Sequence, residues 1–124
     1  MAKILITGSK GMVGRSICER SEADLHKILS PSSAELNLLE ADVVERYLKY
    51  EKPDFIIHSA GVVGGITANI AEPTKFFYEN LQMGINLVNK AKKLGVKNFL
   101  NIASSCMYPR NAINPLNESL ILEG

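Results

Sequence analysis

Three glycines spaced three residues apart stand near the amino terminus, in the segment Gly8-Ser9-Lys10-Gly11-Met12-Val13-Gly14. They follow an apolar run that indicates a buried strand, residues 3–7, and they open a segment with helical spacing, residues 12–20. Gly8 permits a tight turn, Gly11 lets a pyrophosphate approach the backbone, and Gly14 lets the helix pack closely on the sheet. Free N–H groups at the start of the helix suit phosphate oxygens. The pattern therefore predicts a dinucleotide site, with a glycine-rich turn in an unrelated fold as the alternative.

The residues after the second expected strand bear on which dinucleotide is bound. An acidic side chain at that place would accept a hydrogen bond from the ribose 2′-hydroxyl and favour NAD. The chain has Ser30, Ser32 and Ser33 there, with no acid before Glu35, and Lys10 lies in the glycine segment. A cation and hydroxyl groups suit a 2′-phosphate, so the sequence favours NADP. The alternative is that Lys10 is an ordinary solvated lysine.

The elements that position these residues alternate along the chain. Apolar runs and helical spacing predict strands over residues 3–7, 25–29, 55–57 and 96–103, and helices over residues 12–20, 42–52 and 73–94. Asp42 is expected to cap the second helix, and the glycine-rich residues 62–71 are expected to be irregular. Strands separated by helices must run parallel. The expected fold class is α/β, a Rossmann-type doubly wound parallel sheet, incomplete, with about four strands and flanking helices.

Composition narrows the class of protein further. The 124 residues suffice for one domain, and a net charge of +1 from 14 basic and 13 acidic residues argues against nucleic-acid or membrane-surface binding. Cys18 and Cys106 stand far apart in no metal-binding pattern, so we expect neither a disulfide scaffold nor a metal site. No run is long enough for a signal peptide or a membrane span, so we expect a soluble, cytoplasmic domain.

Several further segments carry a family resemblance. They are the glycine segment at 7–14, Glu35-Leu36-Asn37-Leu38-Leu39, Val62-Val63-Gly64-Gly65-Ile66 with Ala68-Asn69, the set Pro73, Phe76, Tyr78 and Asn80, Ser104-Ser105-Cys106-Met107-Tyr108-Pro109, and Pro115-Leu116-Asn117-Glu118-Ser119. Together they resemble the extended, sugar-nucleotide branch of the short-chain dehydrogenase/reductase superfamily, and within it the GDP-L-fucose synthases. The resemblance runs the full length of this chain but matches only the amino-terminal part of those enzymes.

The resemblance implies an activity and a set of site residues. The activity is 3,5-epimerisation and NADPH-dependent 4-reduction of GDP-4-keto-6-deoxy-mannose. Ser104 would hydrogen-bond the C4 oxygen of the sugar, and Cys106 would act as an acid/base in epimerisation. The residues that would bind NADP are Gly8, Ser9, Lys10, Gly11, Met12, Val13, Gly14, Ser33, Asn37, Leu38, Ile102, Ala103 and Ser105. Without the resemblance, the alternative for Ser104 is a polar residue at the end of a strand that makes backbone hydrogen bonds. The alternative for Cys106 is a small, half-buried apolar residue.

The chain departs from the family pattern at the catalytic base, and it also lacks the family's partner histidine. The family's base is a Tyr followed four residues later by a Lys, yet the four tyrosines are followed there by Glu51, Asp54, Gln82 and Ala112. We therefore expect residues 1–105 to be an NADP-binding portion, and residues 106–124 a loop leading to a catalytic and substrate-binding part that this sequence lacks. We expect the chain alone to have little or no reductase activity, and an apolar sheet edge and helix face to be exposed.

The partners and the remaining alternatives follow from the same comparison. A homodimer through the long helix, or a complementing second chain, would cover the exposed face. The strand-end His58 is expected to be structural, and Asn69 is a candidate to border the substrate. Two other functions stay open: a non-catalytic NADP-binding or regulatory module, and a fragment of another nucleotide-sugar epimerase or dehydratase.

Overall fold

The computed structural model describes residues 1–121 and 123, and its centre is a four-stranded parallel sheet. The strands β1 (Lys3–Thr7), β2 (Lys27–Leu29), β3 (Phe55–His58) and β4 (Asn98–Asn101) lie in the order β2-β1-β3-β4. Ile4 pairs with Ile28 on one side and with Phe55 on the other, and every pair is parallel. The chain moves outward from β1 to β2 and then returns past β1 to β3. The expected doubly wound sheet is confirmed, and its strand order reverses between β1 and β3, where such folds bind ligands.

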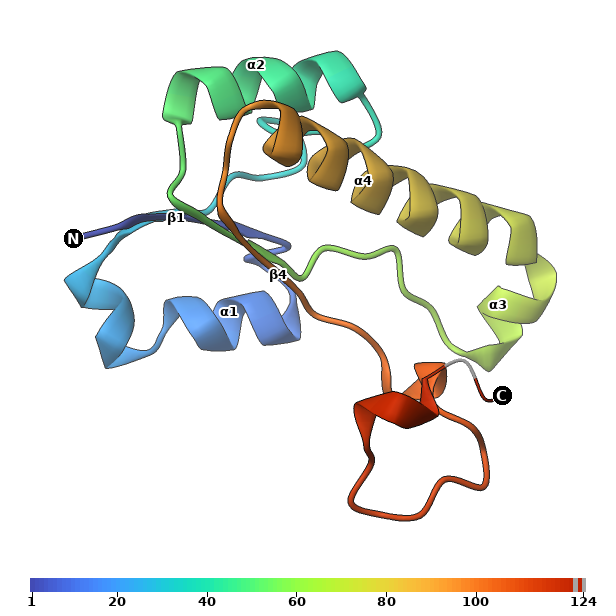
Figure 1. Cartoon of the computed structure of the whole chain (residues 1–124). Helices are drawn as coiled ribbons and strands as arrows, with labels where there is room; N and C mark the ends of the chain where they lie inside the picture. The colour runs from blue at the N-terminus through green and yellow to red at the C-terminus, as the bar shows by residue number, and fades with distance from the viewer. Residues whose placement is uncertain (122, 124) are drawn as a thin grey trace.

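Helices cover both faces of this sheet, but unequally. Helix α1 (Met12–Cys18) lies on one face, and α2 (Ala41–Glu51) and α4 (Pro73–Lys93) lie on the other (Figure 1). The core fills the space on the α2 and α4 side, where its buried members include Leu5, Leu29, Val44, Leu48, Ile56, Leu87 and Ala91. On the α1 side, Ile4, Ile28 and Ile57 remain partly exposed. One short helix cannot cover that face completely.

Several elements differ from the sequence-based expectation. Residues 21–25 form a short 3₁₀ helix, η1 (Ser21–Leu25), so β2 begins only at Lys27, and β4 spans residues 98–101 instead of 96–103. The stretch expected to be irregular contains α3 (Ile66–Ala71). The side chains of Ile66 and Ile70 on α3 are 83% and 75% exposed. A helix that buries no apolar face needs no amphipathic pattern in its sequence, and the periodicity of apolar residues therefore did not predict α3.

The residues at the ends of α2 and α4 agree only in part with the sequence-based expectation. Helix α2 begins at Ala41 without a side-chain cap, so the expected N-cap role of Asp42 is wrong. The Asp42 carboxylate instead lies in the first turn, where a negative charge interacts favourably with the helix dipole. Helix α4 begins with Pro73 as expected, and the chain leaves it through Gly95 at a φ of +77°.

The segment after β4 extends away from the sheet (Figure 1). It contains two short 3₁₀ helices, η2 (Ser105–Met107) and η3 (Glu118–Leu120), and the expected loop portion 106–124 includes Leu122 and Gly124, which lie outside the described residues. Along α4, five large apolar or aromatic side chains face outward: Phe77, Tyr78, Leu81, Ile85 and Val88, each 48–70% exposed. Within the described chain, no helix combines the length and apolar character needed to span a bilayer.

A cluster of four charges fastens α2 to α4. The Glu45 carboxylate forms an ion pair with Lys49 on its own helix at 2.6 Å. It also forms ion pairs with Lys90 and Lys93 on α4, at 2.5 and 3.3 Å. Hydrogen bonds from Lys49, Lys90 and Lys93 lower the pKa of Glu45 from 4.5 to about 2. The cluster joins residues 45 positions apart in the chain, Glu45 and Lys90, so it supports the tertiary arrangement and not only a local turn.

This cluster should make stability depend on acid. Because the folded-state pKa of Glu45 lies below its unfolded value, its contribution is present above a pH of about 4.5 and is lost as the pH falls through about 2. We expect Glu45→Gln to reduce the slope of unfolding free energy against pH in that window, measured by urea titration at several pH values. Lys90→Met should reduce the slope less, because two lysines remain. An unchanged slope in Glu45→Gln would contradict the assignment.

Candidate functional site

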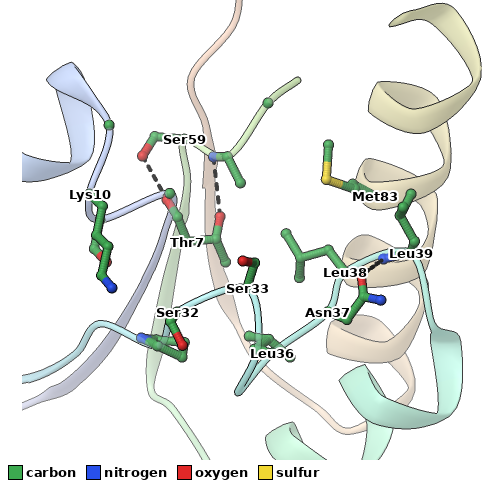
Figure 2. A pocket seen from close by; sticks show the side chains of 16 residues that line it. Thr7, Lys10, Ser32, Ser33, Leu36, Asn37, Leu38, Leu39, Ser59 and Met83 are labelled. Carbon is green, nitrogen blue, oxygen red and sulfur yellow. Dashed lines mark hydrogen bonds between the residues drawn. The ribbon is translucent and has the colours of Figure 1, made fainter. Parts of the chain in front are cut away.

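A cavity of about 390 Å³ opens at the carboxyl ends of β1 and β3. Its walls come from the glycine turn, the loop after β2, the end of β3 and one residue of α4 (Figure 2). The lining residues are Thr7, Gly8, Ser9, Lys10, Gly11, Pro31, Ser32, Ser33, Leu36, Asn37, Leu38, Leu39, Ser59, Ala60, Gly61 and Met83. The cavity therefore lies at the point where the strand order reverses, as expected of a ligand site in this class of fold.

The glycine turn owes its shape to missing side chains. Gly8 has a φ of +70°, and a Cβ at this position would lie 2.7 Å from the backbone of Ala60. A Cβ on Gly14 would lie 2.3 Å from the carbonyl oxygen of Gly8, so α1 can begin this close to the turn only with glycine there. The N–H of Gly11 donates to the same oxygen at 2.9 Å and closes the turn. Gly11 itself is exposed at the cavity, which leaves its surface open to an anionic group.

Hydrogen bonds tie the ends of β1 and β3 together beneath this turn. The Thr7 hydroxyl and His58 Nδ1 share a buried hydrogen bond of 2.8 Å, and the Ser59 hydroxyl donates to the Thr7 carbonyl at 2.7 Å. The Ala60 N–H also approaches the Thr7 hydroxyl oxygen, at 3.4 Å. Burial lowers the pKa of His58, which favours its neutral form. The expected structural role of His58 fits this geometry, because it holds the strand ends that form one wall of the cavity.

The loop after β2 supplies the opposite wall. Figure 2 shows Lys10, Ser32 and Ser33 on one side of the cavity, and Leu38, Leu39 and Met83 on the other. The Asn37 side chain is occupied within the loop: its oxygen accepts from the Leu39 N–H at 3.1 Å. One side of the cavity is therefore polar and basic, whereas the other offers apolar surface against which a flat ring can pack.

Three asparagine side chains hold this apolar wall and the loop beyond β3 through hydrogen bonds to the backbone. The buried Asn86 of α4 donates through Nδ2 to the Leu38 carbonyl at 2.8 Å. The Asn80 carboxamide accepts from the Val62 N–H at 2.8 Å and donates to the Val62 carbonyl at 2.9 Å. The Asn69 Nδ2 donates to Gly64 and Gly65 carbonyls at 2.9 and 3.0 Å, so its side chain folds its own loop. Polar residues of α3 and α4 thus hold two loops near the cavity.

Ser104 and Cys106 lie elsewhere, beyond β4. The Ser104 hydroxyl oxygen accepts from the Cys106 N–H at 3.1 Å and caps η2. Cys106 lines a second cavity of about 780 Å³, formed by Ser105, Cys106, Met107, Tyr108, Pro109, Arg110, Ala112 and Leu116. This second cavity shares no lining residue with the first. Both side chains are exposed, so either is accessible to a reactant.

The sequence-predicted cofactor residues divide into three groups. Those that line the first cavity are Gly8, Ser9, Lys10, Gly11, Ser33, Asn37 and Leu38. Met12, Val13 and Gly14 belong to the first turn of α1 and do not line it, and Ile102, Ala103 and Ser105 lie on the segment after β4. The roles of all these residues stay predictions. Among the described residues, no group of three or more His, Cys, Asp or Glu side chains is placed to hold a metal ion.

Sequence reasoning missed other lining residues. Ser59, Ala60 and Gly61 directly follow β3, and the rule that ligands bind at the carboxyl ends of parallel strands could have found them. Thr7 ends β1 and was open to the same reasoning. Met83 lies in the middle of α4, more than forty residues from any other lining residue except those after β3, and no sequence signal marks it. Only the packing of α4 brings Met83 to the cavity.

Comparison with known proteins gives a consistent set of similarities. The sequence model of the NAD dependent epimerase/dehydratase family matches residues 4–123. A GDP-L-colitose synthase of Yersinia pseudotuberculosis is 51% identical over 122 residues, which are 98% of this chain and 40% of that protein. A GDP-L-fucose synthase of Azorhizobium caulinodans is 43% identical over 122 residues, 98% of this chain and 39% of that protein. The chain thus spans about 40% of the length of these relatives.

A solved structure supports the same similarity. The GDP-mannoheptose C4 reductase MlghC from Campylobacter jejuni, with NADP bound, superposes with a TM-score of 0.88 at 32% identity. The match covers 99% of this chain and 39% of the reductase. Sequence and fold therefore agree over nearly all of this chain.

The close contact at the glycine turn can be tested with a pair of helical glycines. Gly14→Ala should destabilise the chain by about 1–3 kcal/mol, because its Cβ would meet the Gly8 carbonyl oxygen at 2.3 Å. Gly84→Ala on α4, where a Cβ meets nothing within 4 Å, should stabilise it by about 0.5–1 kcal/mol. The measurement is the free energy of unfolding in urea. Equal effects of the two substitutions would show that the contact does not constrain the turn.

Proposed function

The chain belongs to the NAD dependent epimerase/dehydratase family, and on that basis we propose that it supplies the NADP-binding part of a GDP-sugar epimerase-reductase. The enzyme type proposed is a GDP-L-fucose synthase, which epimerises GDP-4-keto-6-deoxy-mannose at C3 and C5 and reduces it at C4. The observation that carries the proposal is the cavity at the switch point, because its glycine turn has the form that a diphosphate requires.

The residues present fit such a cofactor. The exposed Gly11 leaves the backbone accessible at the turn, and a Cβ there would meet only the Gly8 carbonyl oxygen, at 3.2 Å. Gly8 to Gly11 would hold the pyrophosphate, and the wall formed by Leu38 and Met83 would pack against the adenine. Lys10, Ser32 and Ser33 would receive the 2′-phosphate, as hydroxyl groups and a cation suit a phosphate. The bound cofactor supplies the hydride for the reduction.

The choice of NADP over NAD has two supports. The first is the basic, hydroxyl-rich side of the cavity, which contains Lys10. The second is the similar reductase from C. jejuni, whose structure holds NADP. Glu35 does not line the cavity, so no acidic side chain there competes directly for a ribose hydroxyl.

The substrate is proposed as a GDP-linked keto sugar. Both similar synthases are named for GDP-linked products, and the segment Ser104–Pro109 carries the resemblance to the fucose enzymes. The higher identity to the colitose synthase, 51% against 43%, favours a GDP-L-colitose synthase as the second candidate. The two candidates share the cofactor part and differ in the sugar.

Ser104 and Cys106 are proposed to act on that sugar. A keto group at C4 acidifies the protons on C3 and C5. A thiolate on one face of the sugar could remove such a proton, and an acid on the opposite face would return one to the same carbon. The exposed Cys106 thiol can reach a reactant in the second cavity, and the Ser104 hydroxyl can hydrogen-bond the C4 oxygen. The contact between Ser104 Oγ and the Cys106 N–H holds the two residues in a fixed relation.

Association and location complete the proposal. The outward apolar face of α4, with Phe77 and Leu81 among its members, is proposed to pack against a second copy or a complementing chain. The protein is proposed to act in the cytoplasm, where reducing conditions would keep Cys18 and Cys106 as the free thiols found in the structure.

Cofactor binding by the purified chain tests the central claim. We expect saturable binding of NADPH by isothermal titration, with NADH binding more weakly. Gly11→Val should weaken both cofactors at least tenfold, because a branched side chain would occupy the open surface of the turn. Gly65→Ala, a glycine with no atom within 4 Å of an added Cβ, serves as control. If neither cofactor binds the folded chain, the proposed function is wrong.

A second test concerns turnover. None of the four tyrosines precedes a lysine by four residues, so the chain offers no such pair to protonate the reduced sugar. We expect no oxidation of NADPH when GDP-4-keto-6-deoxy-mannose is added to the chain alone, followed by the absorbance of the reduced nicotinamide. Measurable turnover would contradict this expectation without affecting the binding claim.

A further inference from the structure

The Glu35 carboxylate is hydrogen-bonded to Ser32, a residue of the polar wall of the first cavity. Glu35 Oε2 accepts from both the N–H and the hydroxyl of Ser32, each at 2.7 Å. The Glu35 and Leu36 N–H groups in turn donate to the Ser32 carbonyl at 3.1 and 2.9 Å. The Glu35 carboxylate thus satisfies both donors of Ser32 across a local turn. It folds the turn that carries Ser32 and Ser33 into the cavity wall.

This arrangement also has an electrostatic consequence. The hydrogen bonds from the Ser32 backbone and side chain, and the positive charge of Lys10, lower the pKa of Glu35, so the group is anionic at neutral pH. Lys10 is the cation of the cavity lining, and Glu35 offsets part of its field. The Ser32 hydroxyl is likewise engaged by the carboxylate and is less available to a ligand.

We propose that Glu35 is a specificity-determining residue that limits the affinity of this site for a 2′-phosphorylated dinucleotide. The inference rests on the proposed function. A 2′-phosphate brings close to two negative charges toward Lys10, Ser32 and Ser33, and the Glu35 carboxylate behind them repels it. A plain 2′-hydroxyl carries no charge and feels no such repulsion. Lys10 and Glu35 therefore act in opposite directions on the affinity for the 2′-phosphate. The preference for NADPH over NADH is smaller than it would be with Lys10 alone.

The decisive variant is Glu35→Gln. Its side-chain oxygen can still accept from the Ser32 N–H, so the turn is retained while the charge is removed. We expect the Kd for NADPH to fall about threefold to tenfold at low salt, and that for NADH to change less than about twofold. The gain should shrink as ionic strength rises, because salt screens the repulsion. Asp42→Asn removes the same charge from the exposed first turn of α2, outside the cavity lining, and should leave both constants unchanged.

A second variant removes the same charge through a different side chain. Glu35 is exposed, so Glu35→Ala should also tighten NADPH selectively. It gives the answer if Glu35→Gln fails to fold, which thermal unfolding would reveal. The inference is overturned if the folded variants bind NADPH no better than the parent, or if they tighten NADPH and NADH equally. Failure of the parent chain to bind either cofactor would instead remove the proposed function itself.

Discussion

The close approach of α1 to the turn that precedes it is the constraint on which the site depends. Gly14 meets the Gly8 carbonyl oxygen so closely that no side chain fits between them, and Gly8 meets Ala60 at the end of β3 in the same way. These two contacts bring a helix start, a turn and the neighbouring strand end together. The result is a surface of backbone without side chains at the mouth of the cavity, which is what a diphosphate needs.

Hydrogen bonds between elements hold the rest of the cavity around that turn. Thr7 and His58 join the two central strands below it, while Asn86 fixes Leu38 against α4. The ion pairs of Glu45 with Lys90 and Lys93 connect α2 to α4 on the same side of the sheet. The apolar wall of the cavity, with Leu38 and Met83, therefore depends on the packing of α4.

The two groups of predicted site residues lie apart. The first cavity lies at the carboxyl ends of β1 and β3, whereas Ser104 and Cys106 lie on an irregular segment beyond β4, where Cys106 lines a second cavity. The relatives that resemble this chain are more than twice its length. The portion that this chain shares with them contains the first cavity, the segment of Ser104 and Cys106, and the exposed apolar face of α4.

The sequence by itself determined the glycine turn, the alternation of strands and helices, and the ends of α4, because each depends on local chemistry: missing Cβ atoms, apolar periodicity, and Pro73 and Gly95 at the helix termini. It did not reveal α3 or the unassisted start of α2 at Ala41, where no local signal stands out. Only the tertiary structure placed Met83 in the cavity and joined the Asn86 side chain to the Leu38 carbonyl. The physical reason is that periodicity marks which face of an element is apolar, but it does not specify which distant residue that face will meet.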